Sequence, residues 1–342
     1  MFFFYICSFE KLAESMGEFE LIEHIKHLAV SPEGVLGIGD DCAVLPQNGD
    51  LETLVSTDML MEGVHFLLDD IRPYQLGWKS IAVNISDIAA MGGTPCGSFL
   101  SMALPPSFTS EKIEAFLEGY IHLSRRLGCP LLGGDTVSSI GPLCINVTVT
   151  GTCKKGISRK RSSALPGDGI YVSGTLGDSA AGLKCILDRC KHSSASPVAQ
   201  APDSGQVCPD DYSYLISRHY QPLPRVELGV RLASDPSVHA MMDISDGLAS
   251  DLPHILEASH AGASIDCSLI PMSLQFKRFC EQRGLDPLEL SLCGGEDYEL
   301  LFTAGDQFSP AGLPVTRIGT ITADRVLEWE GQNRIFEGYR HF

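Results

Sequence analysis

Hydrophobic residues in the first half of the chain recur at intervals that predict helices and strands in alternation. Helical spacing appears over residues 19–25, 76–91 and 113–127, and the last of these is followed by Gly128 and Pro130, which are common helix stop signals. A helix with one apolar face buries that face against the rest of its domain. Three core-facing helices are therefore expected here.

Strand-like runs lie between these helices and after them. They cover residues 53–56, 98–103 and 144–150. In the last run Ile145 and Val147 alternate with polar residues, as in a strand with one buried face. Because strands and helices interleave, we expect the first half to form an α/β or α+β domain.

The second half of the chain repeats this style after a polar turn region at residues 162–168. We expect strands at 169–173 and 240–244, one helix from Asp178 and another from about Asp246. The chain is therefore predicted to contain two domains built from mixed sheets packed with helices.

The same turn region places the predicted domain boundary. Residues 1–16 are interpreted as an N-terminal extension, 17–160 as the first domain and 161–342 as the second. Residues 191–211 are rich in Ser, Pro, Ala and Asp and have no periodicity, so a flexible insertion is expected inside the second domain.

Composition narrows the class of protein. The chain has 342 residues, of which 44% are hydrophobic and 20% are charged, as in an ordinary globular protein. Its net charge is −18 and it has no stripe of Lys and Arg, which argues against nucleic-acid binding. No run reaches the roughly 18 apolar residues that a membrane helix needs.

The N-terminus and the cysteines indicate a cytoplasmic protein. The apolar start, residues 1–7, has no basic region before it, and acidic residues follow soon after, so a signal peptide is not expected. The 12 cysteines have irregular spacing and include no Cys-x-x-Cys pair. We therefore expect reduced thiols rather than a disulfide framework.

Aspartates recur beside small residues after strand-like runs. A single aspartate at the end of a strand often only caps the next helix. Several of them arranged alike would repel each other in a partly buried site, so a cation is expected among them. The segments are 39–41, 56–58, 133–136, 243–247 and 294–297, and the predicted helical pair Asn84 and Asp87 is a sixth candidate.

The types of ligand indicate which cation would bind. Carboxylates and hydroxyls without a nearby cluster of His and Cys suit hard ions such as Mg²⁺, Mn²⁺ or Ca²⁺. The chain has no loop with acids at alternate positions, as an EF-hand calcium site requires. Acids recruited from distant loops leave room for water and phosphate oxygens, which favours Mg²⁺ bound to a nucleotide.

The sequence has neither a Walker-type phosphate loop nor a Gly-x-Gly-x-x-Gly turn that opens a helix. Metals would therefore have to hold the phosphates of a nucleotide. Arg161 is the best cationic partner for phosphate oxygens, unless it is a solvated charge in a basic run. Ser245 and the backbone after it would bind phosphate at the start of a helix. His65 follows Asp58 closely, although a lone histidine is more often structural.

Read together and in order, these segments resemble thiamine-monophosphate kinases. The agreement spans residues 17–342 apart from the predicted insertion. The matching runs are GIGDDCAVL (37–45), STDMLMEGVHF (56–66), KSIAVNISDIAAMGGTP (79–95), GGDT (133–136), RSSALPGDGIYVSGTLGDSAAGL (161–183), DISDGLASDL (243–252), GGEDYELLF (294–302) and EGYRHF (337–342).

The resemblance implies a two-domain fold like that of aminoimidazole-ribonucleotide synthetase, with the N-terminal domains paired in a homodimer. It implies transfer of the ATP γ-phosphate to thiamine monophosphate, which gives thiamine diphosphate and ADP. We expect direct in-line transfer, assisted by several Mg²⁺ ions, without a phosphorylated enzyme.

The resemblance also implies which residues bind each ligand. For Mg²⁺ they are Asp41, Ser56, Thr57, Asp58, Asp87, Asp135, Asp243 and Asp246. For ATP they are Gly134, Asp135, Arg161 and Ser245. For the acceptor they are His65, the pair Glu296 and Asp297 with the contacting member left open, and Tyr339, where the family often carries Trp.

Two other interpretations stay open at this stage. One is another ATP-dependent enzyme of the same fold group, for example a synthetase that activates a carbonyl or an amide by phosphorylation. Such an enzyme would not need Tyr339 for a thiamine ring. The other is a protein without catalytic activity, in which the aspartates only bind cations or cap helices.

Overall fold

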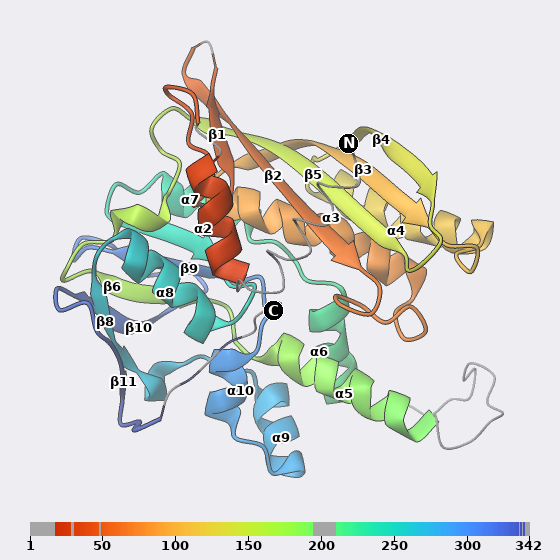
Figure 1. Cartoon of the computed structure of the whole chain (residues 1–342). Helices are drawn as coiled ribbons and strands as arrows, with labels where there is room; N and C mark the ends of the chain where they lie inside the picture. The colour runs from red at the N-terminus through yellow and green to blue at the C-terminus, as the bar shows by residue number, and fades with distance from the viewer. Residues whose placement is uncertain are drawn as a thin grey trace.

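Two β-sheets organise the chain, one in each half (Figure 1). The structure is a computed structural model, and it describes residues 18–28, 31–47, 49–193, 210–334, 336 and 338. The first sheet has five strands in the order β1-β2-β5-β3-β4, and the second has six in the order β11-β8-β10-β6-β9-β7.

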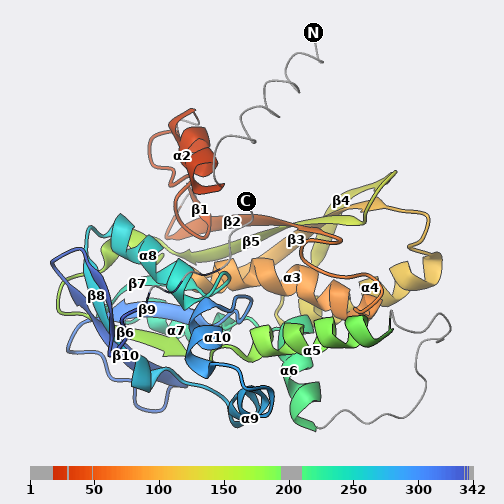
Figure 2. The same ribbon diagram turned by 60° about the horizontal axis from the view of Figure 1, so that its bottom comes forward.

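The first sheet packs one face against the long helices α3 and α4. Figure 2 shows α3 and α4 beneath it, while α2 stands over β1 on the opposite side. Alternate residues of β5 such as Ile145, Val147 and Val149 are fully buried, so the predicted half-buried strand is confirmed. The elements are α2 (Glu18–Leu28), β1 (Ala43–Pro46), β2 (Leu51–Met61), α3 (Pro73–Ala90), β3 (Thr94–Leu104), α4 (Ser110–Arg126), β4 (Leu131–Ser138) and β5 (Cys144–Lys154).

The second sheet is covered on both faces. Val172 in β6 packs with α8, whereas its neighbour Tyr171 packs with α7, because successive residues of a strand point to opposite faces. The elements are η1 (Arg161–Ser163), β6 (Gly169–Ser173), α5 (Asp178–Ser193), α6 (Asp210–Tyr220), α7 (Val226–Ala233), β7 (Val238–Asp243), α8 (Leu248–Ala258), β8 (Gly262–Asp266), η2 (Cys267–Leu269), α9 (Leu274–Arg283), α10 (Pro287–Cys293), β9 (Leu300–Ala304), β10 (Val315–Thr322) and β11 (Leu327–Glu330).

Helix α3 joins the two halves, and glycines let its neighbours approach closely. A side-chain carbon at Gly119 of α4 would lie 1.8 Å from the carbonyl oxygen of Tyr74, and one at Gly229 of α7 would lie 2.1 Å from that of Ala89. The helix starts with Pro73 in its first turn, a position where the missing N–H of proline costs nothing. Side chains on α3 are thus held between both sheets.

The predicted element limits need several corrections. The first predicted strand, 53–56, is part of the longer β2, because its pairing with β5 continues on both sides. The helix expected from Asp246 begins at Leu248, since Gly247 has a φ of 99° that a helix does not allow. The predicted insertion, 191–211, overlaps the end of α5 and the start of α6, and residues 194–209 and 1–16 lie outside the described residues.

Two further expectations concern membranes and disulfides. Among the helices that the structure describes, none is both long and apolar enough to span a bilayer. The cysteines of the described part of the chain form no disulfide with one another.

Candidate active site

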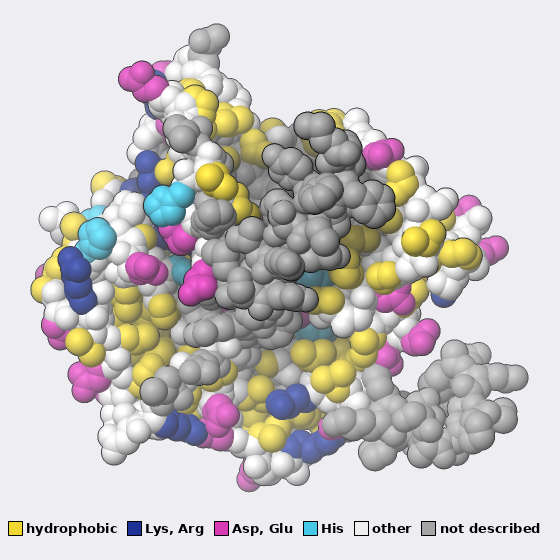
Figure 3. Space-filling model, in the orientation of Figure 1, with side chains coloured by type: hydrophobic (Ala, Val, Ile, Leu, Met, Phe, Trp, Pro, Cys, Tyr) yellow, Lys and Arg dark blue, Asp and Glu magenta, His cyan; other side chains and the backbone are white. Residues whose placement is uncertain are grey.

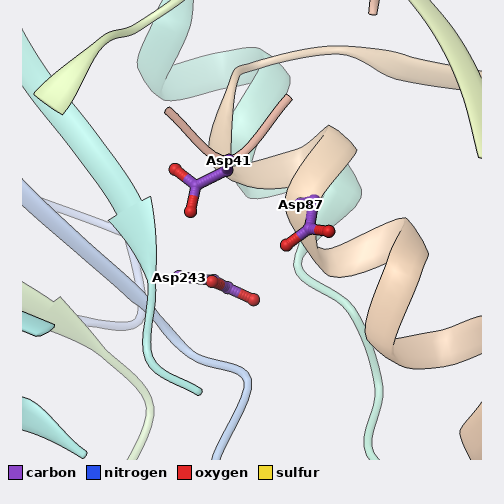
Figure 4. Close-up of side chains that lie close together, drawn as sticks. All are labelled: Asp41, Asp87 and Asp243. Atoms are coloured by element: carbon purple, nitrogen blue, oxygen red, sulfur yellow. The ribbon is translucent and has the colours of Figure 1, made fainter. Parts of the chain in front are cut away.

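Three aspartates from distant parts of the sequence converge between the two sheets. Asp41 lies just before β1, Asp87 lies on α3 and Asp243 ends β7. One carboxylate oxygen from each lies within 4.8 Å of those of the other two. Figure 4 shows the three side chains pointing toward a common space. Each of the two sheets therefore contributes to one acidic centre.

Strand β2 brings two more of the predicted site residues, Ser56 and Asp58, to the helix side of the sheet. The hydroxyl of Ser56 donates a hydrogen bond to Asp87 Oδ2. The backbone N–H of Asp58 donates to Asn84 Oδ1 at 2.9 Å, so Asn84 and Asp87 do face the same strand. Thr57, between these two residues, points to the opposite face, where its hydroxyl lies 2.9 Å from that of Thr148.

Arg161 holds the loop that carries Asp41. Its guanidinium donates to Asp41 Oδ1 at 2.7 Å, and its backbone N–H donates to Asp40 Oδ1 at 2.7 Å. The Ser259 hydroxyl donates to the Arg161 carbonyl at 2.8 Å. Arg161 is thus oriented from both sides and is a member of the site rather than a solvated charge. Asp40 was not among the predicted site residues, although its place beside Asp41 in the sequence could have indicated it.

The acidic centre is electrostatically unfavourable without a cation. Burial, with repulsion from Asp41, raises the pKa of both Asp58 and Asp243, and burial with repulsion from Asp58 and Asp243 raises the pKa of Asp87. Among the described residues, Asp41 Oδ2 and Asp243 Oδ2 are buried and accept no hydrogen bond. Closely spaced carboxylate oxygens with unused lone pairs are the ligand set that Mg²⁺ prefers. These residues therefore fit a hard divalent cation.

The segment after Asp243 is packed tightly by glycines. A side-chain carbon at Gly295 would lie 2.4 Å from the Ser245 carbonyl oxygen, and Gly247 has a φ of 99°. The backbone N–H of Asp246 donates to Asp251 Oδ2 at 3.2 Å. Asp251 is buried and holds this turn in place. It was not predicted as a site residue, although it lies within the motif DISDGLASDL.

A cavity of about 1690 Å³ opens onto the acidic centre. Its lining extends from α2 past the aspartates to α8 and β11, where it reaches Trp329 and Phe336. Acidic side chains are visible beside α2 and α8 on this face of the molecule (Figure 3). The predicted site residues that line the cavity are Asp41, Ser56, Thr57, Asp58, Asp87, Arg161, Asp243, Ser245 and Asp246.

Comparisons with known proteins identify the family. Models of the N-terminal and C-terminal domains of AIR synthase related proteins match residues 39–153 and 166–330. Curated thiamine-monophosphate kinases of Escherichia coli K12 and Bacillus subtilis are 39% and 38% identical to the chain, over 95% and 96% of its length and 98% and 100% of theirs. The chain belongs to the thiamine-monophosphate kinase family.

Solved structures agree with this membership. The structure described as AaThiL complexed with AMPPCP and TMP is 33% identical, covers 96% of this chain and 98% of its own, and has a TM-score of 0.85. Thiamine monophosphate kinase of Aquifex aeolicus is 32% identical, covers 93% and 98%, and has a TM-score of 0.80. The predicted two-domain α/β fold of the aminoimidazole-ribonucleotide synthetase group is thereby confirmed.

The acceptor residues predicted from the kinase family fall into different environments. Glu296 has a side chain that is 27% exposed. Burial raises the pKa of its carboxyl, but the charge of Lys79, with a smaller contribution from His65, brings that pKa below its usual value. Asp297 is buried, and its two oxygens accept hydrogen bonds from the backbone N–H groups of Gly177 and Ser179 at the start of α5. Glu296 is accessible to a ligand, whereas Asp297 is occupied within the protein.

Two residues predicted to bind ATP lie away from the acidic centre of this kinase-family chain. Gly134 and Asp135 are in β4, and β5 and β3 separate that strand from β2, so about 14 Å lies between the strands at ~4.8 Å per spacing. Asp135 is in the row of Ser101, Asn146 and Met59, on the face of the sheet without α3.

The last predicted acceptor residue, Tyr339, lies outside the described residues. Gly338, which precedes it, is described, and a side-chain carbon there would lie 2.8 Å from the carbonyl oxygen of Asp246. The C-terminal segment of the kinase-family chain therefore passes beside the acidic centre at Gly338.

Proposed function

We propose that the chain phosphorylates thiamine monophosphate with ATP, giving thiamine diphosphate and ADP. The observation that carries the proposal is the convergence of Asp41, Asp87 and Asp243 from three elements, in a member of a kinase family whose solved relative holds an ATP analogue and TMP. The reaction belongs to thiamine diphosphate biosynthesis, and ATP serves as co-substrate.

Mg²⁺ is proposed as the cation of the acidic centre. Asp41, Asp58, Asp87 and Asp243 would hold it together with Ser56, and Thr57 and Asp246 also line the cavity. When bound, Mg²⁺ would neutralise the charge of the phosphates that meet in this site. The buried oxygens of Asp41 and Asp243 that accept no hydrogen bond from described residues support this role.

The residues of the chain orient the reaction rather than supply a strong base. A phosphate acceptor is already nucleophilic at neutral pH, so no residue needs to remove a proton from it. In the proposed step an acceptor phosphate oxygen forms a bond to the γ-phosphorus. The bond from that phosphorus to the β–γ bridging oxygen breaks, and ADP leaves with the electron pair. Arg161 and Ser245 would hold phosphate oxygens of ATP in line for this transfer.

In this proposal Gly134 and Asp135 contribute to the ATP site of a second copy of the chain. The outer face of the first sheet exposes Met59, Phe99 and Val137, which are 54%, 42% and 55% accessible. Hydrophobic side chains are visible on the surface near β3, β4 and α4 (Figure 3). Pairing of two such faces would bury this apolar surface and bring β4 of one copy toward β2 of the other. We therefore propose a homodimer with shared ATP sites.

Two further expectations remain part of the proposal. The division into domains at 17–160 and 161–342 is supported by the two sheets, which share no strand. Function in the cytoplasm is proposed because the irregularly spaced cysteines indicate reduced thiols. Neither nucleic acid nor a membrane is expected as a partner, given the net charge of −18.

An ADP-release assay tests the proposed substrate. Purified protein is given ATP and either thiamine monophosphate or free thiamine, with Mg²⁺ or with a chelator. We expect ADP only with thiamine monophosphate and Mg²⁺, and thiamine diphosphate as the product. Release driven by free thiamine alone would overturn the substrate assignment. Inversion at a chiral γ-phosphate would support direct transfer, and retention would indicate a phosphorylated enzyme.

A further inference from the structure

A fully buried lysine on α3 is not accounted for by the acidic centre. The side chain of Lys79 has no exposed surface, and its ammonium lies 2.7 Å from Glu296 Oε1. Lys79 precedes Asp87 by eight residues, about two turns along the same helix. A charge with no access to water is retained only when a partner compensates it, so the ion pair with Glu296 is needed for Lys79 to stay charged.

The partner of Lys79 lies in a strained segment. Glu296 has a φ of 64° and Tyr298 a φ of 50°, and residues other than glycine rarely adopt such values. The backbone N–H of Glu296 donates to the Ser245 carbonyl at 2.6 Å, and that of Tyr298 donates to Ile244 at 2.9 Å. The strained segment is therefore attached to the turn that follows Asp243.

The negative charge of Glu296 is compensated by Lys79 rather than by His219. His219 Nδ1 lies 3.3 Å from Glu296 Oε2 and 3.0 Å from the Ser179 hydroxyl. Burial, with the positive charge of Lys79, lowers the pKa of His219 to about 3, so this imidazole is neutral. The carboxylate of Glu296 keeps its negative charge because Lys79 supplies the opposite charge.

We propose that Lys79 is a positioning residue for the acceptor: it holds the Glu296 carboxylate so that its exposed side binds a cationic or amino-bearing ring. This inference rests on the proposed function, since it assigns Glu296 rather than Asp297 to substrate binding. Lys79 is buried and cannot touch the substrate itself. An amine or a cationic heteroaromatic ring is the chemistry that an accessible carboxylate recognises.

Steady-state kinetics of four variants test the proposal. They are Lys79→Met, Lys79→Arg, Glu296→Gln and the double variant Lys79→Met/Glu296→Gln, with the exposed Lys184→Met as control. Lys79→Met and Glu296→Gln should each raise the KM for thiamine monophosphate tenfold or more, and leave the KM for ATP within about twofold. Lys79→Arg should raise the KM for thiamine monophosphate less than Lys79→Met does, because it keeps the positive charge. Lys184→Met should match the unmodified protein.

The double variant separates positioning from general damage. If Lys79 acts through Glu296, the double variant will have the same KM for thiamine monophosphate as Glu296→Gln alone. Its Tm should recover part of the loss seen in each single variant, because no buried charge is left without a partner. The proposal would be overturned if the fold-increases of the two single variants in the KM for thiamine monophosphate multiplied in the double variant. Equal increases in the KM for thiamine monophosphate and the KM for ATP would overturn it as well.

The unmodified protein, measured in the same assay, distinguishes failure of the proposed role of Lys79 from failure of the proposed function. If it does not phosphorylate thiamine monophosphate, the proposed function is wrong and the substrate role of Lys79 falls with it. If it does, and Glu296→Gln has an unchanged KM for thiamine monophosphate, only the role of Lys79 and Glu296 is wrong. Glu296 is partly exposed, so Glu296→Gln serves as the decisive variant if Lys79→Met does not fold.

Discussion

The guanidinium of Arg161 donates a hydrogen bond to Asp41 Oδ1 at 2.7 Å, although 120 residues separate them. This bond joins the start of the second predicted domain to the loop before β1. It also reduces the charge repulsion around Asp41, which neighbours Asp87 and Asp243. Arg161 therefore has two roles in the proposed enzyme: it organises an aspartate of the cation site and offers a charge to ATP.

Substitution of Arg161 should weaken ATP binding and the acidic centre together. Arg161→Lys keeps the charge but loses the planar fork, so the KM for ATP should rise about tenfold. Arg161→Ala should have a larger effect and also lower Tm. Kinetics at varied ATP, with the exposed Lys155→Ala as control, measure this. An unchanged KM for ATP in Arg161→Ala would show that Arg161 only supports the loop.

Removing one buried charge should stabilise the protein without Mg²⁺ while abolishing catalysis. Asp243→Asn removes a carboxyl whose pKa is raised by burial and by repulsion from Asp41, so thermal unfolding in chelator should occur at higher temperature. Activity should fall roughly 100-fold or more, because metal stabilisation of phosphate charge is worth several kcal/mol. Added Mg²⁺ should raise the Tm of the native protein more than that of the variant. Equal Mg²⁺ shifts in both proteins would contradict the cation site.

Gly134 should be required for folding as much as for ATP. It has a φ of 152°, and a side-chain carbon there would lie 1.7 Å from the Leu100 carbonyl oxygen. Gly134→Ala should therefore destabilise the protein by about 2 kcal/mol or more, through strain between β3 and β4. Denaturant unfolding measures this, with Gly141→Ala as control because nothing lies within 4 Å of a carbon added there. A stable Gly134→Ala variant would show that the two strands can move apart.

Stability should fall between pH 7 and pH 5 partly because of His219. Burial and the charge of Lys79 lower its folded pKa to about 3, whereas the unfolded chain binds a proton near pH 6.5. Below pH 6.5 the unfolded state therefore gains protons that the folded state does not, which costs about 2 kcal/mol at pH 5. His219→Asn should lose less stability over this interval than the native protein. Parallel pH profiles of the two proteins would mean that His219 titrates normally when folded.

Much of the fold could be predicted from the sequence, because burial of one face makes hydrophobic residues recur with the period of a strand or a helix. The alternation at Ile145 and Val147 predicted β5, and the helical spacing predicted α3 and α4. The aspartates could be chosen because they recur beside small residues, and Asp41, Asp87 and Asp243 do meet. The family resemblance added their order along the chain, which no single aspartate motif provides.

The remaining features depend on tertiary contacts that leave no period in the sequence. Lysine is a residue type that is usually found at the surface. Only the packing of α3 between both sheets places Lys79 against Glu296. The choice between Glu296 and Asp297 depends on the N–H groups of α5, more than 100 residues earlier in the chain. The location of Asp135 depends on strand order, which the sequence of one strand does not specify.

Mixing two inactive variants should restore activity if Asp135 acts across the proposed dimer. Asp135→Asn and Asp87→Asn would each inactivate every site of a homodimer. When Asp135 reaches the partner's acidic centre, a mixed dimer has one site with both substitutions and one without either. Random exchange of subunits then makes half of the dimers mixed, so about a quarter of the native activity should return. ADP release after joint unfolding and refolding measures this.

A mixture of Asp87→Asn and Asp243→Asn is the control, because those residues share one centre within one chain and every mixed dimer stays inactive. Activity that stays absent in the first mixture, while gel filtration shows mixed dimers, would place Asp135 outside the shared site, since each variant would then inactivate only its own copy.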